Sequence, residues 1–196
     1  MLLNQLLNFQ HDPRDKAARG HTLNNIRQVL RGYGPPPGFS GPPELDAFSV
    51  FAGYLVLDAL ISNRDRHSEN WAVLRGPRKD DQYLAPSYDH ASALGFNLGD
   101  QQRTLHFQDP NMMDAFIRKG TAYRFEGCRK TTLVDHAHTA LGQAGDAARD
   151  YWCSSLSRID ENHVRMLVSR LPVMSEVARR FAIHVLISNR RRLLHE

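Results

Sequence analysis

Residues 44–70, ELDAFSVFAGYLVLDALISNRDRHSEN, join a long apolar stretch to a dense polar cluster. Between Leu45 and Ile61 the apolar side chains occupy nearly every face of a helical wheel, which predicts a helix of about 18 residues in the middle of a core. This helix delivers the polar cluster to a loop at its C-terminal end. Asp and Asn in loops most often act only as turn and cap residues, so a chemical role for this cluster needs further support.

The chain before this helix divides into two parts. Apolar residues recur at helical spacing within residues 15–31, which predicts a first helix. Residues 32–43, GYGPPPGFSGPP, must form a stiff surface connection, because proline is excluded from helix interiors and central strands. We expect Pro42 and Pro43 to start the buried helix, with Glu44 and Asp46 in its first turn. The domain boundary is placed between residues 1–43 and 44–196.

Downstream of the polar cluster, two short apolar stretches predict strands. They are NWAVLRG, residues 70–76, and DQYLAPSYD, residues 81–89, and the charged turn between them is typical of a β-hairpin. The pattern is irregular from residue 90 to about residue 113. Helical spacing returns at 112–120, 129–141, 160–170 and 174–194. The sequence therefore predicts a mainly α fold with one short β-hairpin.

Composition excludes several classes of protein. No apolar stretch reaches the length of a membrane-spanning helix, and the N-terminus has neither the basic region nor the cleavage site of a signal peptide, so we expect a cytoplasmic protein with no membrane partner. The net charge is +4, but the basic residues are scattered, so nucleic acid is not expected as a direct partner. Cys128 and Cys153 have no metal-site spacing and are expected to be packing residues.

Three polar residues around the predicted hairpin form a chemically meaningful set. Asn70 follows Asp65 by five positions, and Asp89 ends the second predicted strand. Phosphoryl transfer requires a carboxylate that orients an acceptor hydroxyl and accepts its proton, and oxygen ligands that hold magnesium at the triphosphate. Asp65, Asn70 and Asp89 can supply all of these groups.

The same segments resemble a known family. NRDRHSEN, followed by LAPSYDHASALG, is similar to the catalytic loop and the metal-binding segment of the HipA-like kinases, bacterial relatives of the Ser/Thr protein kinases best known as toxins of toxin–antitoxin pairs. The resemblance implies that Asp65 is the catalytic base and that Asn70 and Asp89 are ligands of Mg²⁺, with ATP as phosphoryl donor and a protein as substrate. Arg66 and His67 are expected to order the loop.

The D-R-H-x-x-N string also resembles the catalytic loop of phosphoinositide kinases, so a lipid acceptor is an alternative. Two features count against it. The metal-binding Asp of that family is usually followed by Phe-Gly, whereas His90 and Ala91 follow Asp89 here. Lys119 and Lys130 are the only lysines beyond Asp89, which is few for an anionic headgroup.

A kinase also needs an N-terminal lobe with a glycine-rich strand pair and a lysine for the phosphates. The first 64 residues contain no G-x-G-x-x-G, and Lys16 is the only lysine before Asp65. We therefore expect a kinase-like C-terminal lobe without the N-terminal sheet lobe. Three alternatives stay open: a kinase whose N-lobe is supplied by a missing segment or by another chain, an inactive remnant or regulator, and a helical binding module. If the chain is such a kinase, an antitoxin chain is a further expected partner.

Overall fold

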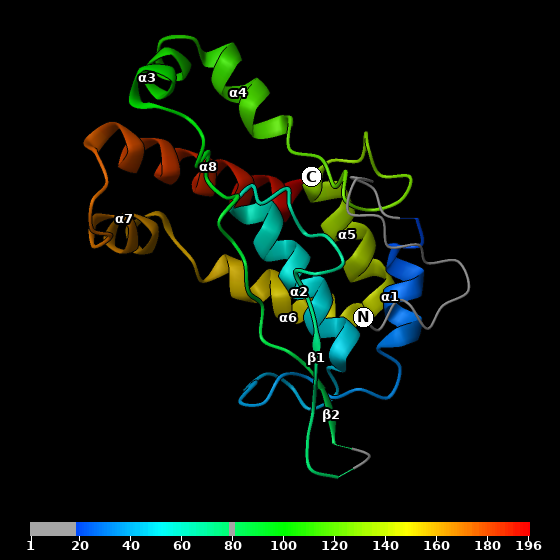
Figure 1. Cartoon of the computed structure of the whole chain (residues 1–196). Helices are drawn as coiled ribbons and strands as arrows, with labels where there is room; N and C mark the ends of the chain where they lie inside the picture. The colour runs from blue at the N-terminus through cyan, green and yellow to red at the C-terminus, as the bar shows by residue number, and fades with distance from the viewer. Residues whose placement is uncertain (1–18, 79–80) are drawn as a thin grey trace.

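The computed structural model describes residues 19–78 and 81–196. They form eight helices and one two-stranded sheet (Figure 1). The helices are α1 (Leu23–Val29), α2 (Ala47–Leu60), α3 (Asp100–Gln108), α4 (Pro110–Arg118), α5 (Leu133–Ala144), α6 (Asp146–Ser157), α7 (Glu161–Ser169) and α8 (Glu176–His195). The strands β1 (Val73–Arg75) and β2 (Gln82–Leu84) pair antiparallel, with Leu74 opposite Tyr83. The predicted mainly α fold with a short hairpin is confirmed.

Helix α2 lies at the centre of the molecule and packs against α5, α6 and α8 (Figure 1). Twelve of its residues are buried, from Ala47 to Ala59, as the apolar pattern on all its faces predicts. Its start differs from our expectation. Asp46 precedes the helix as its N-cap, and the Asp46 side chain accepts a hydrogen bond of 2.8 Å from Ser49 N.

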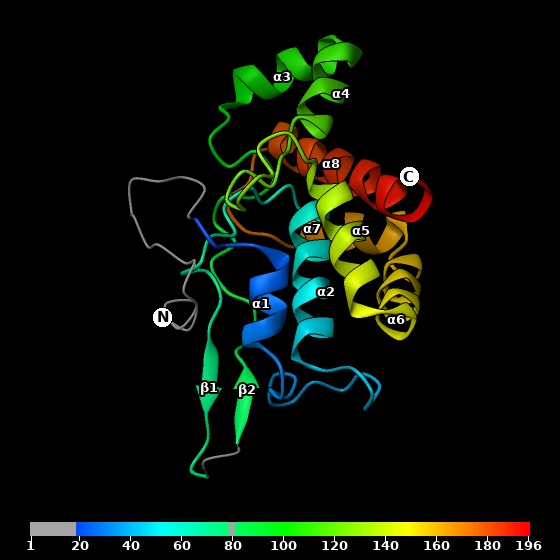
Figure 2. The same ribbon diagram turned by 90° about the vertical axis from the view of Figure 1, so that its right-hand side faces the viewer.

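The first helix is shorter than predicted. Thr22 caps α1 and Leu30 ends it, so residues 19–22 and 31 are not helical, and residues 15–18 lie outside the described part of the chain. The Pro/Gly connection then touches the hairpin. Gly34 forms an isolated parallel bridge with Tyr83 of β2. Figure 2 shows α1 next to α2. The hairpin extends past the C-terminal end of α1 and the N-terminal end of α2.

Two helices fall where no helix was predicted. Helix α3 lies within the stretch read as irregular, and it buries none of its side chains, so the sequence carries no apolar period for it. Helix α6 follows α5 after Gly145 alone, at φ +100°, and only two of its side chains are buried. A helix that buries so little of its surface shows only a weak periodic signal.

Two smaller cores surround the N-terminal half of α8. Met113 and Ile117 of α4 pack against Phe181 and Val185 of α8, while α7 packs on another face of α8. Within residues 19–78 and 81–196, no helix is long and apolar enough to cross a membrane. The sheet of this part of the chain has two strands only, so the multistranded sheet of a kinase N-lobe is absent from it.

Candidate active site

The polar cluster lies on a loop that is anchored to α2 by a buried ion pair. Arg66 Nε donates to Asp58 Oδ2 at 2.7 Å, and Arg66 Nη2 donates to Asp58 Oδ1 at 2.8 Å. Both side chains are only 2% exposed. Asn63 Nδ2 adds a hydrogen bond of 2.7 Å to Asp58 Oδ1. A buried carboxylate requires such partners, because burying an unpaired charge is costly.

The same guanidinium joins the loop to the segment after the hairpin. Arg66 Nη1 donates to the main-chain carbonyls of Asn70 and Tyr88, at 2.5 and 3.3 Å, and Nη2 donates to Ser87 Oγ at 3.1 Å. Two carbonyls that bond one nitrogen must lie close together. The structure thus brings the main chain of Asn70 close to that of Tyr88, the residue before Asp89. In the sequence 19 positions separate Asn70 from Asp89.

Asp65 is paired with an arginine from a distant part of the chain. Arg124 Nε donates to Asp65 Oδ1 at 2.6 Å, and Arg124 Nη2 lies 2.5 Å from the same oxygen. Within the described part of the chain Asp65 Oδ2 accepts no hydrogen bond. The Asp65 side chain is 28% exposed.

The segment that carries Arg124 is fixed by the residues before α1. His21 Nδ1 donates to the Arg124 carbonyl at 2.8 Å, and Gly20 N donates to Glu126 Oε2 at 2.7 Å. The His21 ring stacks on Phe125 at a centroid distance of 4.3 Å. Burial lowers the pKa of His21 to about 4 and that of His136, which also contacts Phe125, to about 4. Both rings are therefore neutral at pH 7.

Asn70 and Asp89 offer oxygen atoms for a metal ion. Asn70 Nδ2 donates to the Asp65 carbonyl at 2.7 Å, while Asn70 Oδ1 accepts no hydrogen bond from any described residue. Asp89 is exposed and its backbone is left-handed, at φ +57°, which is uncommon for a residue other than glycine. In the described residues no three His, Cys, Asp or Glu side chains could together hold a metal. A metal here would take one amide, one carboxylate and groups of a bound substrate, as Mg²⁺ commonly does.

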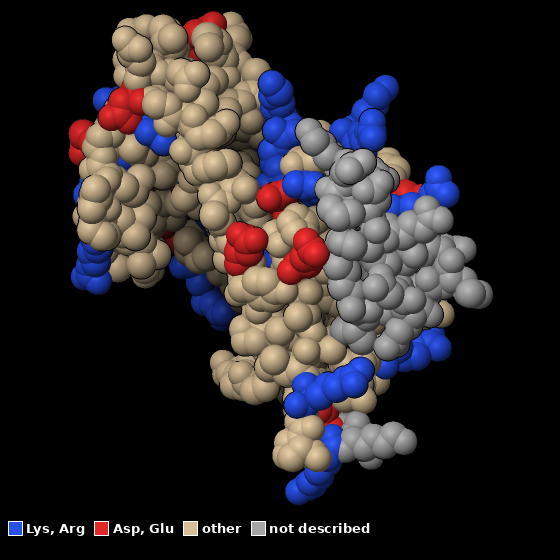
Figure 3. Space-filling model, in the orientation of Figure 1, with Lys and Arg blue, Asp and Glu red and all other residues tan. Residues whose placement is uncertain are grey.

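His67 and Tyr88 make local contacts within the same region. The His67 ring accepts a hydrogen bond from Glu69 N at Nδ1, at 3.2 Å, which places the ring proton of the neutral form on Nε2. The Tyr88 hydroxyl donates to the Glu69 carbonyl at 2.8 Å, a second link between loop and segment. Partial burial raises the pKa of Tyr88. Figure 3 shows acidic side chains grouped near the centre of this face, with Lys and Arg side chains close above them.

A cavity of about 850 Å³ opens beside Asp65. It is lined by Ser62, Arg64 and Asp65, by Ser92 and residues 95–98, by residues of α3 and α4, and by Lys119, Tyr123 and Arg124. Neither Asn70 nor Asp89 lines it. Of the three predicted site residues, Asp65 alone lines this cavity.

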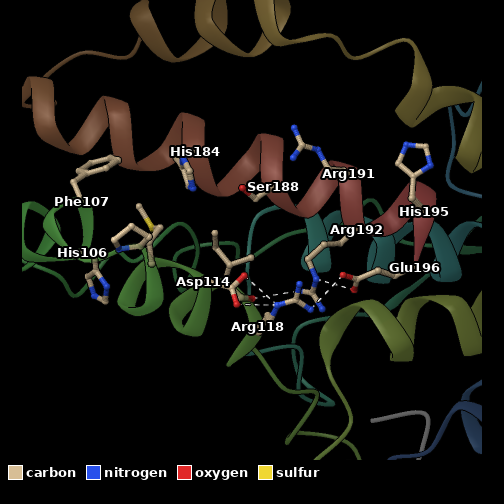
Figure 4. Close-up of a pocket in the computed structure, with 13 residues that line it drawn as sticks. His106, Phe107, Asp114, Arg118, His184, Ser188, Arg191, Arg192, His195 and Glu196 are labelled. Carbon is tan, nitrogen blue, oxygen red and sulfur yellow. Dashed lines mark hydrogen bonds and ion pairs between the residues drawn. The ribbon is translucent and has the colours of Figure 1, made fainter.

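A second cavity, of about 450 Å³, lies between the α3–α4 pair and α8 (Figure 4). Its charged groups are largely paired with one another. Arg118 bonds Asp114 and Glu196, and Arg192 bonds Glu196 (Figure 4). None of the predicted site residues lines this cavity.

Sequence reasoning missed Asp58 and Arg124. Asp58 could have been found, because it is the one charged residue in an otherwise apolar helical stretch, and such a residue needs a buried partner. Arg124 gives no such signal. It lies 59 positions from Asp65, and no local sequence pattern connects the two residues.

Comparisons with known proteins point to a protein kinase. A scan against known protein families finds no match. The sequence is 26% identical over 180 residues to the serine/threonine-protein kinase CtkA of Helicobacter pylori, in a match that covers 90% of this chain and 52% of the relative. The crystal structure of the proinflammatory kinase CtkA from Helicobacter pylori superposes with a TM-score of 0.71 and 19% identity, over 98% of this chain and 63% of that one.

The chain spans about half the length of the curated relative that it matches. The structural match confirms the predicted fold class, a mainly helical kinase-like fold with one hairpin. The chain is thus homologous to part of a serine/threonine kinase and has a kinase-like fold.

Proposed function

We propose that this chain is the C-terminal lobe of a HipA-like Ser/Thr kinase, which transfers a phosphoryl group from Mg-ATP to a hydroxyl of a protein. Asp65 is the catalytic base, and Asn70 and Asp89 are the metal ligands. Arg66 and His67 order the loop. A cytoplasmic location, and an N-lobe or antitoxin chain as partner, belong to the same proposal.

One observation carries the proposal. Arg66 holds the loop of Asp65 and Asn70 against the segment that precedes Asp89, through a guanidinium that is itself fixed on the central helix. A loop that served only as a turn would need no such connection to a second segment. Similarity to a Ser/Thr kinase supports the same conclusion.

The residues of this chain divide the chemistry between them. Asp65 Oδ2 faces an acceptor hydroxyl and takes its proton, while Arg124 on Oδ1 fixes the orientation of the carboxylate. Asn70 Oδ1 and the Asp89 carboxylate accept no hydrogen bond from any described residue and are oxygen atoms of the kind that Mg²⁺ prefers, so the residues fit this ion. Mg²⁺, when bound, neutralises charge on the phosphates. Nothing in the described residues replaces the glycine-rich loop and lysine of an N-lobe.

The test is a radiolabelled-ATP assay of the chain with and without an N-lobe that carries the glycine-rich loop and strand lysine. We expect weak transfer by the chain alone, because phosphoryl transfer depends almost entirely on positioning, and strong transfer after the N-lobe is supplied. Asp65→Asn should then lower the rate about 10²- to 10⁴-fold, the usual contribution of a general base. Asp89→Asn should abolish the response to Mg²⁺.

Asp150→Asn is the matched control, since Asp150 is an exposed carboxylate on α6 far from the predicted set in sequence. Equal transfer by the Asp65→Asn variant would remove Asp65 from the mechanism. Transfer to phosphatidylinositol vesicles in place of protein would favour the lipid-kinase alternative. No transfer under any condition would leave the chain as a binding or regulatory module.

A further inference from the structure

The cavity beside Asp65 has a strongly unbalanced charge. Its lining includes the cations Arg64, Lys119 and Arg124, and Asp65 is its single carboxylate among the described residues. Arg124 is already paired with Asp65. Arg64 and Lys119 are exposed and have no carboxylate partner in residues 19–78 and 81–196. Two cations without a carboxylate partner among the described residues therefore line the cavity.

The cavity next to α8 contrasts in part, since of its three arginines only Arg191 has no carboxylate partner among the described residues. There Arg118 and Arg192 are both neutralised by carboxylates of the chain itself (Figure 4). Among the described residues Arg64 and Lys119 lack such partners, so their charge is available to a ligand.

Arg64 is held in place by an aromatic ring. Its guanidinium lies 5.2 Å from the centroid of Tyr123, and the guanidinium of Arg124 lies 5.1 Å from the same centroid. Cation–π contacts of this kind restrict a side chain that would otherwise be flexible. Arg64 would therefore lose less conformational freedom when it binds a ligand.

Part of the remaining lining is an apolar wall. Phe96 is 63% exposed and Met112 is 41% exposed, and Phe116 and Leu98 complete this wall. A volume of about 850 Å³ falls in the range of pockets that enclose most of a drug-sized ligand. The occupant that fits is a short chain with both apolar and acidic groups, rather than a simple anion.

We propose that this cavity binds an acidic peptide segment, whose Asp or Glu side chains contact Arg64 and Lys119 and whose Ser or Thr lies at Asp65. The assignment of the Ser or Thr rests on the proposed kinase function, whereas the binding of an acidic peptide does not. The cavity touches Asp65 but neither candidate metal ligand, so it lies on the acceptor side of the site.

Single-stranded nucleic acid fits the same charge less well. It is held by a groove of cations that follows the backbone and by aromatic rings on which bases stack. The Tyr123 ring already contacts two guanidinium groups, which compete with a base for its faces. Among the described residues, two cations of the cavity lack a carboxylate partner, too few for a track along a phosphate backbone.

The test measures peptide binding to the 196-residue chain by fluorescence anisotropy. The probe is a labelled peptide in which glutamates and a phenylalanine flank an alanine at the acceptor position, and its twin carries glutamines instead. We expect the glutamate peptide to bind about tenfold more tightly at low salt, with the difference shrinking as salt screens the charges. Arg64→Ala and Lys119→Ala should each weaken its binding about two- to fivefold, the range for exposed ion pairs.

Lys130→Ala is the matched control, because Lys130 is also an exposed lysine but does not line the cavity. It should leave the affinity unchanged. Equal affinity for the two peptides, or no loss in Lys119→Ala, would overturn the proposal. An oligonucleotide that binds more tightly than the glutamate peptide and is equally sensitive to Lys119→Ala would also overturn it.

Failure of this proposal can be told apart from failure of the kinase proposal. With the N-lobe supplied, equal phosphorylation of serine peptides flanked by glutamate or by glutamine would reject the acidic preference and leave the kinase intact. Binding of the alanine peptide with the expected mutational losses, but without phosphotransfer to its serine counterpart, would support the peptide site and reject the kinase.

Discussion

Replacing Arg66 by methionine removes the group that holds the candidate site together. Methionine has a similar length and no charge, so the packing of the aliphatic part is largely kept while five hydrogen bonds are lost. Asp58 then remains 2% exposed without its cation. Asn63 Nδ2 still donates to Asp58 Oδ1, which compensates part of the charge.

The expected cost follows from this burial. Removing one partner of a buried ion pair costs about 3–5 kcal/mol, and the remaining Asn63 contact places Arg66→Met near the lower end of that range, about 3 kcal/mol. For a chain of this size such a loss lowers the melting temperature by about 6–12 °C. The variant Asp58→Asn/Arg66→Met should recover about half of the loss, because no unpaired charge stays buried.

Urea denaturation followed by far-UV circular dichroism measures these free energies. The matched control is Arg165→Met, which breaks an ion pair with Glu161 whose side chains are 58% and 52% exposed. It should cost less than about 1 kcal/mol. Hydrogen exchange adds a local readout, since residues 63–70 and 85–90 should exchange faster than the α2 core in Arg66→Met. A loss below about 1 kcal/mol in Arg66→Met, or no local change in exchange, would refute the reasoning.

Two further predictions concern stability. The pKa values of His21 and His136, about 4 in the folded chain against an ordinary 6.5, mean that the unfolded chain binds more protons between these values. Stability is therefore full above pH 6.5 and is lost as the pH falls toward 4, by about 2 kcal/mol per histidine between pH 7.5 and 5. His136→Leu should remove about half of this dependence in urea titrations at both pH values, and an unchanged dependence would contradict the assignment. Gly53→Ala should destabilise by about 1–3 kcal/mol, because its Cβ would lie 2.2 Å from the Trp152 ring. Gly142→Ala, whose Cβ meets nothing closer than 3.7 Å, should instead stabilise by about 0.5–1 kcal/mol, and thermal melts that show the same sign for both would reject the packing argument.

Elements with a strong apolar pattern could be predicted from the sequence. Helix α2 is apolar on all faces and is buried on all faces, and α7 and α8 begin within two residues of their predicted starts. The hairpin lies where it was predicted, although its strands are shorter. Helices α3 and α6 could not be found by apolar spacing, because they bury few side chains or none.

The candidate site, too, could be predicted only in part from the sequence. The sequence by itself determined the spacing of Asp65 and Asn70, because both lie on one loop, and it determined the buried helix that delivers them. Only the tertiary structure decided that Arg124 bonds Asp65, that Arg66 joins the loop to the segment before Asp89, and that two cations without a described carboxylate partner line a cavity beside Asp65. The physical reason is separation along the chain. Local spacing fixes which side chains share a loop or a helix face, whereas contacts between residues as far apart as 65 and 124 exist only after packing around α2 has placed both segments.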